Sequence, residues 1–130
     1  GAAVLAARLD DNERRYEAAE HLFRCPAAAA APLLRQFVRR WLVPPVLKVW
    51  VAAALARLGD PEGERLLREF LVSRRTTVRG LTLQVLGEID LPWARDALEK
   101  FAASPAAEGW REEADAALGR GPGPHDPPDD

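Results

Sequence analysis

Residues 47–101 read LKVWVAAALARLGDPEGERLLREFLVSRRTTVRGLTLQVLGEIDLPWARDALEKF, and this stretch contains the same helical unit twice. A shift of 31 positions places Leu55 on Leu86 and Leu67 on Leu98. Each copy holds two segments with apolar residues at helical spacing. A period of about 30 to 47 residues with two amphipathic helices per unit is typical of an α-solenoid, in which stacked units bury one another's apolar faces.

The repeat extends in both directions with small changes of spacing. Upstream, Leu34 aligns with Leu67, and downstream Leu118 aligns with Leu86. In the second helix of each unit a Leu is followed one turn later by a Phe. These residues are Leu34, Leu67 and Leu98 with Phe37, Phe70 and Phe101. We expect this Leu/Phe ladder to form the core of the domain.

The predicted organisation is one repeat domain over residues 1–119, followed by a disordered tail over residues 120–130. The domain comprises a partial unit at 1–9, helix pairs at 12–42, 45–73 and 76–103, and a final helix at 109–119. Turn residues mark the boundaries, since Pro44 and Pro45 separate two pairs. Gly59 fits the end of one helix, and Asp60 can cap the next. The tail is rich in Pro, Gly and Asp and has no apolar side chain to form a core.

Composition indicates an ordinary globular protein rather than a membrane protein. Hydrophobic residues make up 48% of the chain and charged residues 29%, and no run of 18 uncharged apolar residues could cross a bilayer. The single cysteine, Cys25, cannot form an internal disulfide, and we expect it to be a buried thiol at a helix end. A cytoplasmic location is therefore expected.

Residues with catalytic or metal-binding potential are sparse. The two histidines are His21 and His125, and the neighbouring pair Glu20 and His21 is not repeated. No nucleophile–base set, glycine-rich phosphate loop or Cys-X-X-Cys motif is present. We therefore expect no catalytic residues, no metal site and no cofactor, and the protein is not expected to be an enzyme.

Several short motifs resemble a known repeat family. They are AAALARLGDP at residues 52–61, TVR at residues 77–79 and VLGEI at residues 85–89. In these motifs the chain is similar to HEAT-like repeats of the phycobilisome-lyase type. The resemblance implies an all-α fold, a right-handed α-solenoid (an α-α superhelix) of HEAT-like helix pairs. In such repeats the first helices form the convex side and the second helices the concave side, and most members mediate protein–protein contacts.

Charge is distributed unevenly along the chain. Residues 35–79 contain ten basic and four acidic side chains, although the whole chain carries a net charge of −2. The arginines opposite the apolar stripe of the second helices are Arg35, Arg39, Arg65 and Arg68. Such a row can bind an acidic segment of a partner, or phosphates, through bidentate pairs. The alternative is a solvated surface with local ion pairs, each contributing about 0 to 1 kcal/mol.

The tryptophans fall into two groups. Trp50 and Trp110 lie in first helices, where apolar residues align between units, so packing is expected for both. Trp41 and Trp93 lie at the ends of second helices, where the repeat does not require an apolar side chain. These two are candidate anchors for a partner.

The predicted function is that of a non-catalytic protein–protein interaction scaffold or adaptor, which binds a partner through the concave face of the second helices. One alternative is a nucleic-acid-binding solenoid of the HEAT-like DNA glycosylase type that uses the basic region from Arg35 to Arg79. The net charge of −2 and an isoelectric point near 5.8 disfavour it. Another alternative is an accessory lyase or chaperone subunit. The sequence sets neither the partner's identity nor the oligomeric state.

Overall fold

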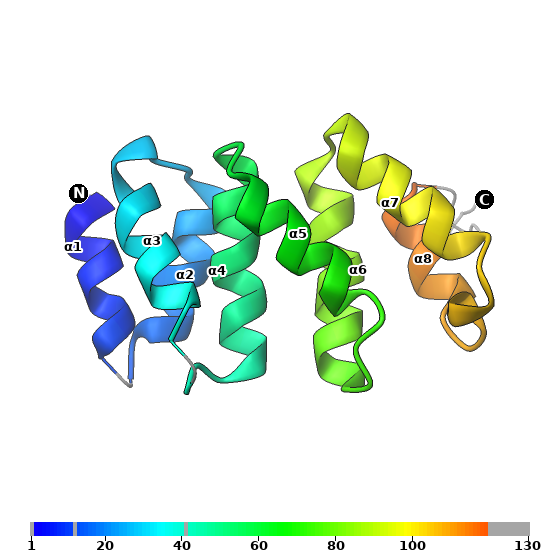
Figure 1. Ribbon diagram of the computed structural model, residues 1–130, viewed down its shortest axis with the longest axis horizontal. Helices are drawn as coiled ribbons and strands as arrows, with labels where there is room; N and C mark the ends of the chain where they lie inside the picture. Colours follow the sequence, from blue (N-terminus) through cyan, green and yellow to red (C-terminus); the bar gives the residue numbers. More distant parts are fainter. Residues whose placement is uncertain (1, 12, 41, 120–130) are drawn as a thin grey trace, which may run out of the picture. The chain divides into compact units, whose positions relative to one another are not determined.

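The structure, a computed structural model, describes residues 2–11, 13–40 and 42–119, and the regular elements of this part of the chain are all helical. The α-helices are α1 (Ala2–Ala7), α2 (Arg15–Arg24), α3 (Ala31–Val38), α4 (Pro45–Arg57), α5 (Pro61–Phe70), α6 (Thr76–Ile89), α7 (Pro92–Ala102) and α8 (Arg111–Ala117). Short 3-10 helices lie at η1 (Arg8–Asp10), η2 (Ala28–Ala30) and η3 (Pro105–Ala107). The expected all-α fold is confirmed (Figure 1). The predicted disordered tail, 120–130, lies outside the described residues.

The chain divides between Glu69 and Phe70 into two compact units. The first contains α1 to α4 and nearly all of α5, and the second contains α6 to α8. Each unit has helices of both kinds that the repeat predicts. α2 and α4 are first helices in one unit, and α6 and α8 in the other.

The first unit is built around α4. Its most extensive helix contact is between α2 and α4, while α3 packs against α4 and α1 against α2. The buried residues of α4 are Leu47, Val49, Val51, Ala52, Ala53, Ala54, Leu55 and Ala56. α5 approaches this small-residue surface closely, because a Cβ placed on Gly63 would lie only 2.6 Å from the carbonyl oxygen of Ala52. Glycine is therefore the residue that fits at this crossing.

In the second unit α6 packs against both α7 and α8. The buried residues of α6 are Val78, Thr82, Leu83, Val85, Leu86 and Ile89. A Cβ on Gly87 would lie 2.8 Å from the carbonyl oxygen of Ala117, whereas one on Gly80 would lie 3.6 Å from the Trp110 ring, an ordinary contact. Close packing thus explains Gly87, while Gly80 leaves room beside Trp110.

An arginine ties neighbouring segments together in each unit. The guanidinium carbon of Arg57 lies 4.8 Å from the centre of the Phe23 ring, and its Nη1 donates to the Phe23 carbonyl at 3.3 Å. In the second unit Arg79 lies 5.5 Å from the centre of the Trp110 ring and donates to the Ala106 carbonyl at 3.3 Å. Both side chains combine a cation–π contact with a hydrogen bond to backbone.

The predicted Leu/Phe ladder is confirmed except at Phe70. Relative exposure is 0% for Leu34 and Leu67, 2% for Leu98, and 5% for both Phe37 and Phe101. Phe70 is half-buried, so the expectation that it belongs to the core is wrong. Phe70 is the last residue of α5, and the boundary between the two units falls directly before it, so Phe70 is not part of the compact unit that contains Leu67.

The expectation of a buried thiol is also wrong. Cys25 is exposed, because α2 ends at Arg24 and Cys25 follows as the C-cap residue at the surface.

Trp50 and Trp110 pack against neighbouring residues of their own units, as predicted. Trp50 meets Phe23 edge-on with ring centres 5.7 Å apart, and Trp110 packs beside Arg79 and Gly80.

Candidate functional site

The four arginines singled out from the sequence all lie in the first unit, on or next to α3 and α5. Arg35 is in the last turn of α3 and Arg39 is its C-cap residue. Arg35 Nη1 donates to Asp60 Oδ2 at 2.9 Å, and Arg39 Nη2 donates to Glu62 Oε1 at 2.8 Å. These two ion pairs join the end of α3 to the beginning of α5. The structure therefore brings together residues more than twenty positions apart in sequence.

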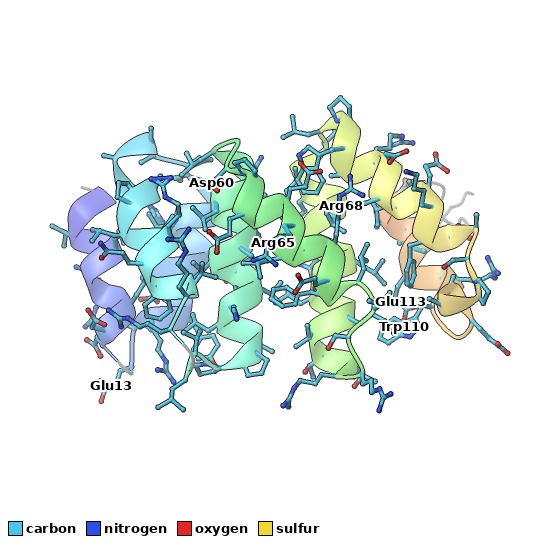
Figure 2. The ribbon with its side chains drawn as sticks, viewed as in Figure 1. Glu13, Asp60, Arg65, Arg68, Trp110 and Glu113 are labelled. Carbon is cyan, nitrogen blue, oxygen red and sulfur yellow. The ribbon has the colours of Figure 1, made fainter. Side chains whose placement is uncertain are left out.

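The other two arginines pair along α5 itself. Arg65 Nη1 donates to Glu69 Oε2 at 2.6 Å and lies 3.9 Å from Glu62. Arg68 Nε donates to Glu64 Oε2 at 3.1 Å. Figure 2 shows Arg65 and Arg68 on α5 and Asp60 at its N-terminal end. Both of these hydrogen-bonded pairs have the spacing of four residues that places side chains next to each other on a helix.

We call the eight residues of these ion pairs the α3–α5 charged face. They are Arg35, Arg39, Asp60, Glu62, Glu64, Arg65, Arg68 and Glu69. The face carries four positive and four negative side chains, so the basic stripe expected from the sequence is electrically balanced by carboxylates of the same chain. The arginine side chains remain accessible, with 38% to 65% of their surface exposed.

The strongest electrostatic effect at this face is on Arg39. Its hydrogen bond with Glu62 raises the pKa of Arg39 above the ordinary value. The charges of Glu62 and Asp60 act in the same direction, and desolvation acts against them. Arg39 therefore stays positively charged throughout the ordinary pH range.

Asp60 has two roles at the start of α5. Its Oδ1 accepts a hydrogen bond from the backbone N–H of Glu62 at 2.9 Å, as an N-cap residue does, while Oδ2 pairs with Arg35. Gly59 before it has a φ of +81°, which favours glycine. The turn predicted from Gly59 and Asp60 is therefore confirmed in both of its parts.

Replacing Asp60 with Ala is expected to lower the free energy of unfolding by about 1 to 2 kcal/mol. Loss of the cap costs about 1 kcal/mol, and loss of the partly exposed ion pair adds about 0 to 1 kcal/mol. Urea denaturation followed by circular dichroism measures the difference. The control is Asp60→Asn, which keeps a capping oxygen but removes the charge and should cost less. Equal losses in the two variants would show that the cap contributes little.

Of the two candidate tryptophan anchors, the structure describes only Trp93. Trp93 lies in the first turn of α7 and is half-buried. Trp41 lies outside the described residues. Trp93 belongs to the second unit, and the α3–α5 charged face belongs to the first.

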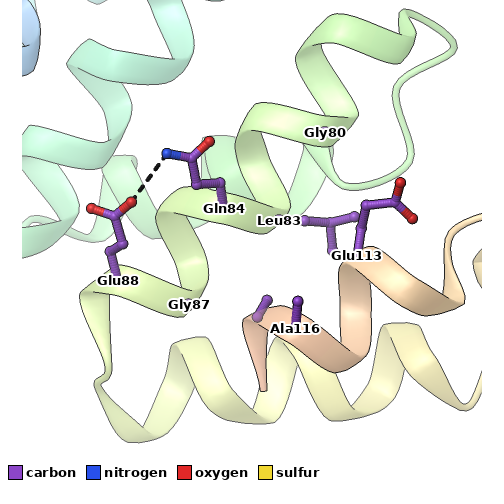
Figure 3. A pocket seen from close by; sticks show the side chains of 8 residues that line it. Gly80, Leu83, Gln84, Gly87, Glu88, Glu113 and Ala116 are labelled. Atoms are coloured by element: carbon purple, nitrogen blue, oxygen red, sulfur yellow. Dashed lines mark hydrogen bonds between the residues drawn. The ribbon is translucent and has the colours of Figure 1, made fainter. Parts of the chain in front are cut away.

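A groove that the sequence analysis did not predict runs between α6 and α8 in the second unit (Figure 3). Its volume is about 460 Å³, and it is lined by Gly80, Leu83, Gln84, Gly87, Glu88, Glu113, Ala116 and Ala117. Gln84 Nε2 donates to Glu88 Oε2 at 3.1 Å on one side of it. The signal that the sequence offers is a pair of glycines, Gly80 and Gly87, seven positions apart on one face of α6. Small residues at this spacing favour close helix packing but do not predict the open space beside it.

The described residues contain neither a metal-binding cluster nor a membrane-spanning helix. No cluster of three or more His, Cys, Asp or Glu side chains suited to a metal ion occurs within residues 2–11, 13–40 and 42–119. In the same part of the chain, none of the helices combines the length and the hydropathy needed to cross a bilayer.

A protein-family model matches the central and C-terminal part of the chain. The sequence model that describes HEAT repeats matches residues 43–119, which is more than half of the chain. The chain belongs to the HEAT-repeat family. The matched HEAT repeats contain α4 to α8, so Arg65 and Arg68 lie inside the match and Arg35 and Arg39 lie before it.

The HEAT-repeat match does not identify a subtype, so the resemblance to the phycobilisome-lyase type is not confirmed. No curated protein and no solved structure matches the chain significantly. HEAT repeats are generally protein-interaction scaffolds, and the family is typically non-catalytic.

Proposed function

We propose that this HEAT-repeat chain is a non-catalytic protein-interaction scaffold that binds an acidic segment of a partner protein through the α3–α5 charged face. The proposal rests on the two ion pairs that join α3 to α5, Arg35 with Asp60 and Arg39 with Glu62. These ion pairs hold the end of α3 beside α5, so that the arginines of both segments lie on one surface in ordered positions. The general role of HEAT repeats in protein interactions supports a protein as the ligand.

The internal carboxylates favour binding by ordering the arginines before a partner arrives. A long side chain loses about 0.5 to 1.5 kcal/mol of conformational freedom when it is immobilised at an interface. At this face part of that cost is already met on folding, because each guanidinium group is held by a carboxylate of the same unit. The arginines are therefore partly preorganised for a ligand.

Replacing an internal carboxylate at this face by a carboxylate of the ligand costs little free energy. Exposed ion pairs contribute only about 0 to 1 kcal/mol each, so an incoming carboxylate gives up little by replacing or sharing an internal one. A guanidinium group has five N–H donors in a planar fork, and the hydrogen bond of Arg35 to Asp60 is made by Nη1. A partner's carboxylate can therefore approach Arg35 while Asp60 stays in place.

The balanced charge of the face argues for protein over nucleic acid. Nucleic-acid sites combine many positive charges with few negative ones, because affinity comes largely from neutralising phosphates. Here Asp60, Glu62, Glu64 and Glu69 would repel a phosphate backbone that lies along α5. A short acidic peptide can place single carboxylates between these residues, whereas a duplex presents closely spaced charges along its whole length.

The test uses two double variants with the same change of charge. Arg39→Glu with Arg65→Glu reverses the most exposed arginines of the face, and Arg74→Glu with Arg75→Glu reverses two exposed arginines outside it. The probe is a capped, dye-labelled peptide of alternating Glu and Ala, titrated by fluorescence anisotropy at two salt concentrations. The face variant is expected to lose about tenfold or more in affinity, since tenfold corresponds to about 1.4 kcal/mol, less than one charge-assisted hydrogen bond. The control variant should lose less than about twofold.

A labelled DNA duplex titrated in parallel distinguishes the alternative. Tighter binding of the duplex than of the peptide, with a steep fall of affinity as salt increases, would favour a nucleic-acid-binding function. Equal peptide affinity for the two double variants would contradict the role of the α3–α5 charged face. Circular dichroism of both variants provides the control for folding.

A further inference from the structure

The groove between α6 and α8 has the properties of a second binding surface, separate from the α3–α5 charged face. Its volume of about 460 Å³ lies within the range of about 300 to 1,000 Å³ that is common for ligand sites. Its lining residues on α6 run from Gly80 to Glu88, which is about 12 Å along a helix. All of the lining residues belong to the second unit. A side chain with the backbone on either side of it fits these dimensions.

The groove exists because small residues line it. Gly87 brings α6 against α8 at Ala117, and a Cβ there would clash with the α8 backbone. Next to this contact, Gly80 and Ala116 occupy little volume, and Leu83, the only large apolar side chain in the lining, is itself 1% exposed. Figure 3 shows Leu83 and Ala116 on facing helices, with Glu113 near Leu83 and Glu88 at the end toward Gly87. The lining thus combines an apolar surface with carboxylates.

The negative charge of the groove favours a positively charged ligand. Two of its eight lining residues, Glu88 and Glu113, are acidic, and none is basic. In the described part of the chain Glu113 has no ion pair or hydrogen bond, in contrast to the carboxylates of α5, which are paired with arginines. A cation that approaches the groove on the α8 side therefore meets the Glu113 carboxylate and no competing cation among the lining residues.

We infer that the α6–α8 groove binds a segment of a partner protein that carries a Lys or Arg side chain. The basic group pairs with Glu113, and the stem of the side chain lies along the small residues Gly80 and Ala116. Long basic side chains commonly cover apolar surface in this way while their charged end stays near water and carboxylates. The inference does not depend on the proposed function, because the two surfaces lie in different units and select opposite charges.

The test is a selection of binders from a library of random 12-residue peptides on phage. The full chain is the target, and binders that also bind the Ala116→Trp variant are removed, because a Trp at this exposed position fills the groove. The surviving sequences are expected to be enriched in Lys or Arg. Survivors without basic residues, or the absence of any survivors, would overturn the inference.

Synthetic capped peptides of the selected sequences then test the carboxylate. Glu113→Lys is expected to weaken binding by about tenfold or more, since it exchanges an attractive pair for a repulsive one. The matched control is Glu112→Lys, which makes the same change in the same first turn of α8 at an exposed residue that does not line the groove. Equal effects of the two changes would overturn the assignment to the groove.

The wild-type chain provides a readout that requires no variant. In a ¹⁵N–¹H correlation spectrum, addition of a selected peptide should shift the amides of Gly80, Gly87 and Ala116. Shifts confined to α3 and α5 would place the peptide elsewhere and contradict the inference. Sedimentation of the chain alone provides a last check, because self-association that Ala116→Trp abolishes would assign the groove to a second copy instead.

Discussion

Replacing Phe23 with Ala is expected to lower the free energy of unfolding by about 3 to 5 kcal/mol. Phe23 is fully buried, meets the Trp50 ring edge-on at 5.7 Å and lies under the guanidinium group of Arg57. It also lies in the most extensive helix contact of the first unit, between α2 and α4. Domains are stabilised by only about 5 to 15 kcal/mol, so this one change removes a large part of the total.

Chemical denaturation followed by circular dichroism and by tryptophan fluorescence measures the loss. The control is Tyr16→Ala in the same helix, where the aromatic side chain is 42% exposed and its loss should cost less than about 1 kcal/mol. A loss below about 1 kcal/mol for Phe23→Ala would show that the α2–α4 contact is not a main source of stability.

Gly63→Ala is expected to destabilise the chain by about 2 kcal/mol or more. The added Cβ would lie 2.6 Å from the Ala52 carbonyl oxygen and 2.9 Å from the Ala56 Cα, and these backbone atoms of α4 cannot move aside independently. Overpacking typically costs about 1 to 3 kcal/mol, and the clash with backbone atoms places Gly63→Ala at the upper end of this range or above it. The gain in helix propensity from Gly to Ala, about 1 kcal/mol at most, offsets only part of it.

The same substitution at Gly80 is the matched control. A Cβ there meets only the Trp110 ring at 3.6 Å, so the gain in helix propensity should be retained and Gly80→Ala should stabilise the chain by up to about 1 kcal/mol. Two identical changes are therefore expected to differ by about 3 kcal/mol in urea denaturation. Similar effects at both positions would mean that α5 does not pack closely on α4.

Much of the fold could be predicted from the sequence because local signals agree with the repeat. The 31-residue shift, the helix pairs and the buried Leu residues all follow from apolar spacing, and the Gly59–Asp60 turn follows from the conformational preference of glycine and the capping ability of Asp. Phe70 shows the limit. A repeat alignment assigns equivalent positions, but burial depends on which residues pack into one compact unit, and the boundary between the units falls directly before Phe70.

The candidate site was predictable only in part. Spacing alone indicates pairs such as Arg65 with Glu69, since residues four apart face each other on a helix. The pairs of Arg35 and Arg39 with residues of α5 depend on how the end of α3 meets the start of α5, which sequence spacing does not specify. The positive charges of this face were therefore predictable from the sequence, whereas their neutralisation by carboxylates of the same unit was not.

Arg57 and Arg79, which combine a cation–π contact with a hydrogen bond to a backbone carbonyl, bear on the design of synthetic repeats. A designer who sorts positions by hydropathy would assign Arg57 and Arg79 to the freely variable surface, yet each stacks on a ring and donates to a backbone carbonyl. Lysine would conserve the charge but lacks the planar fork that stacks and donates at the same time. An idealised array based on this chain should therefore treat both arginines as fixed parts of the packing and vary Arg74 and Arg75 instead.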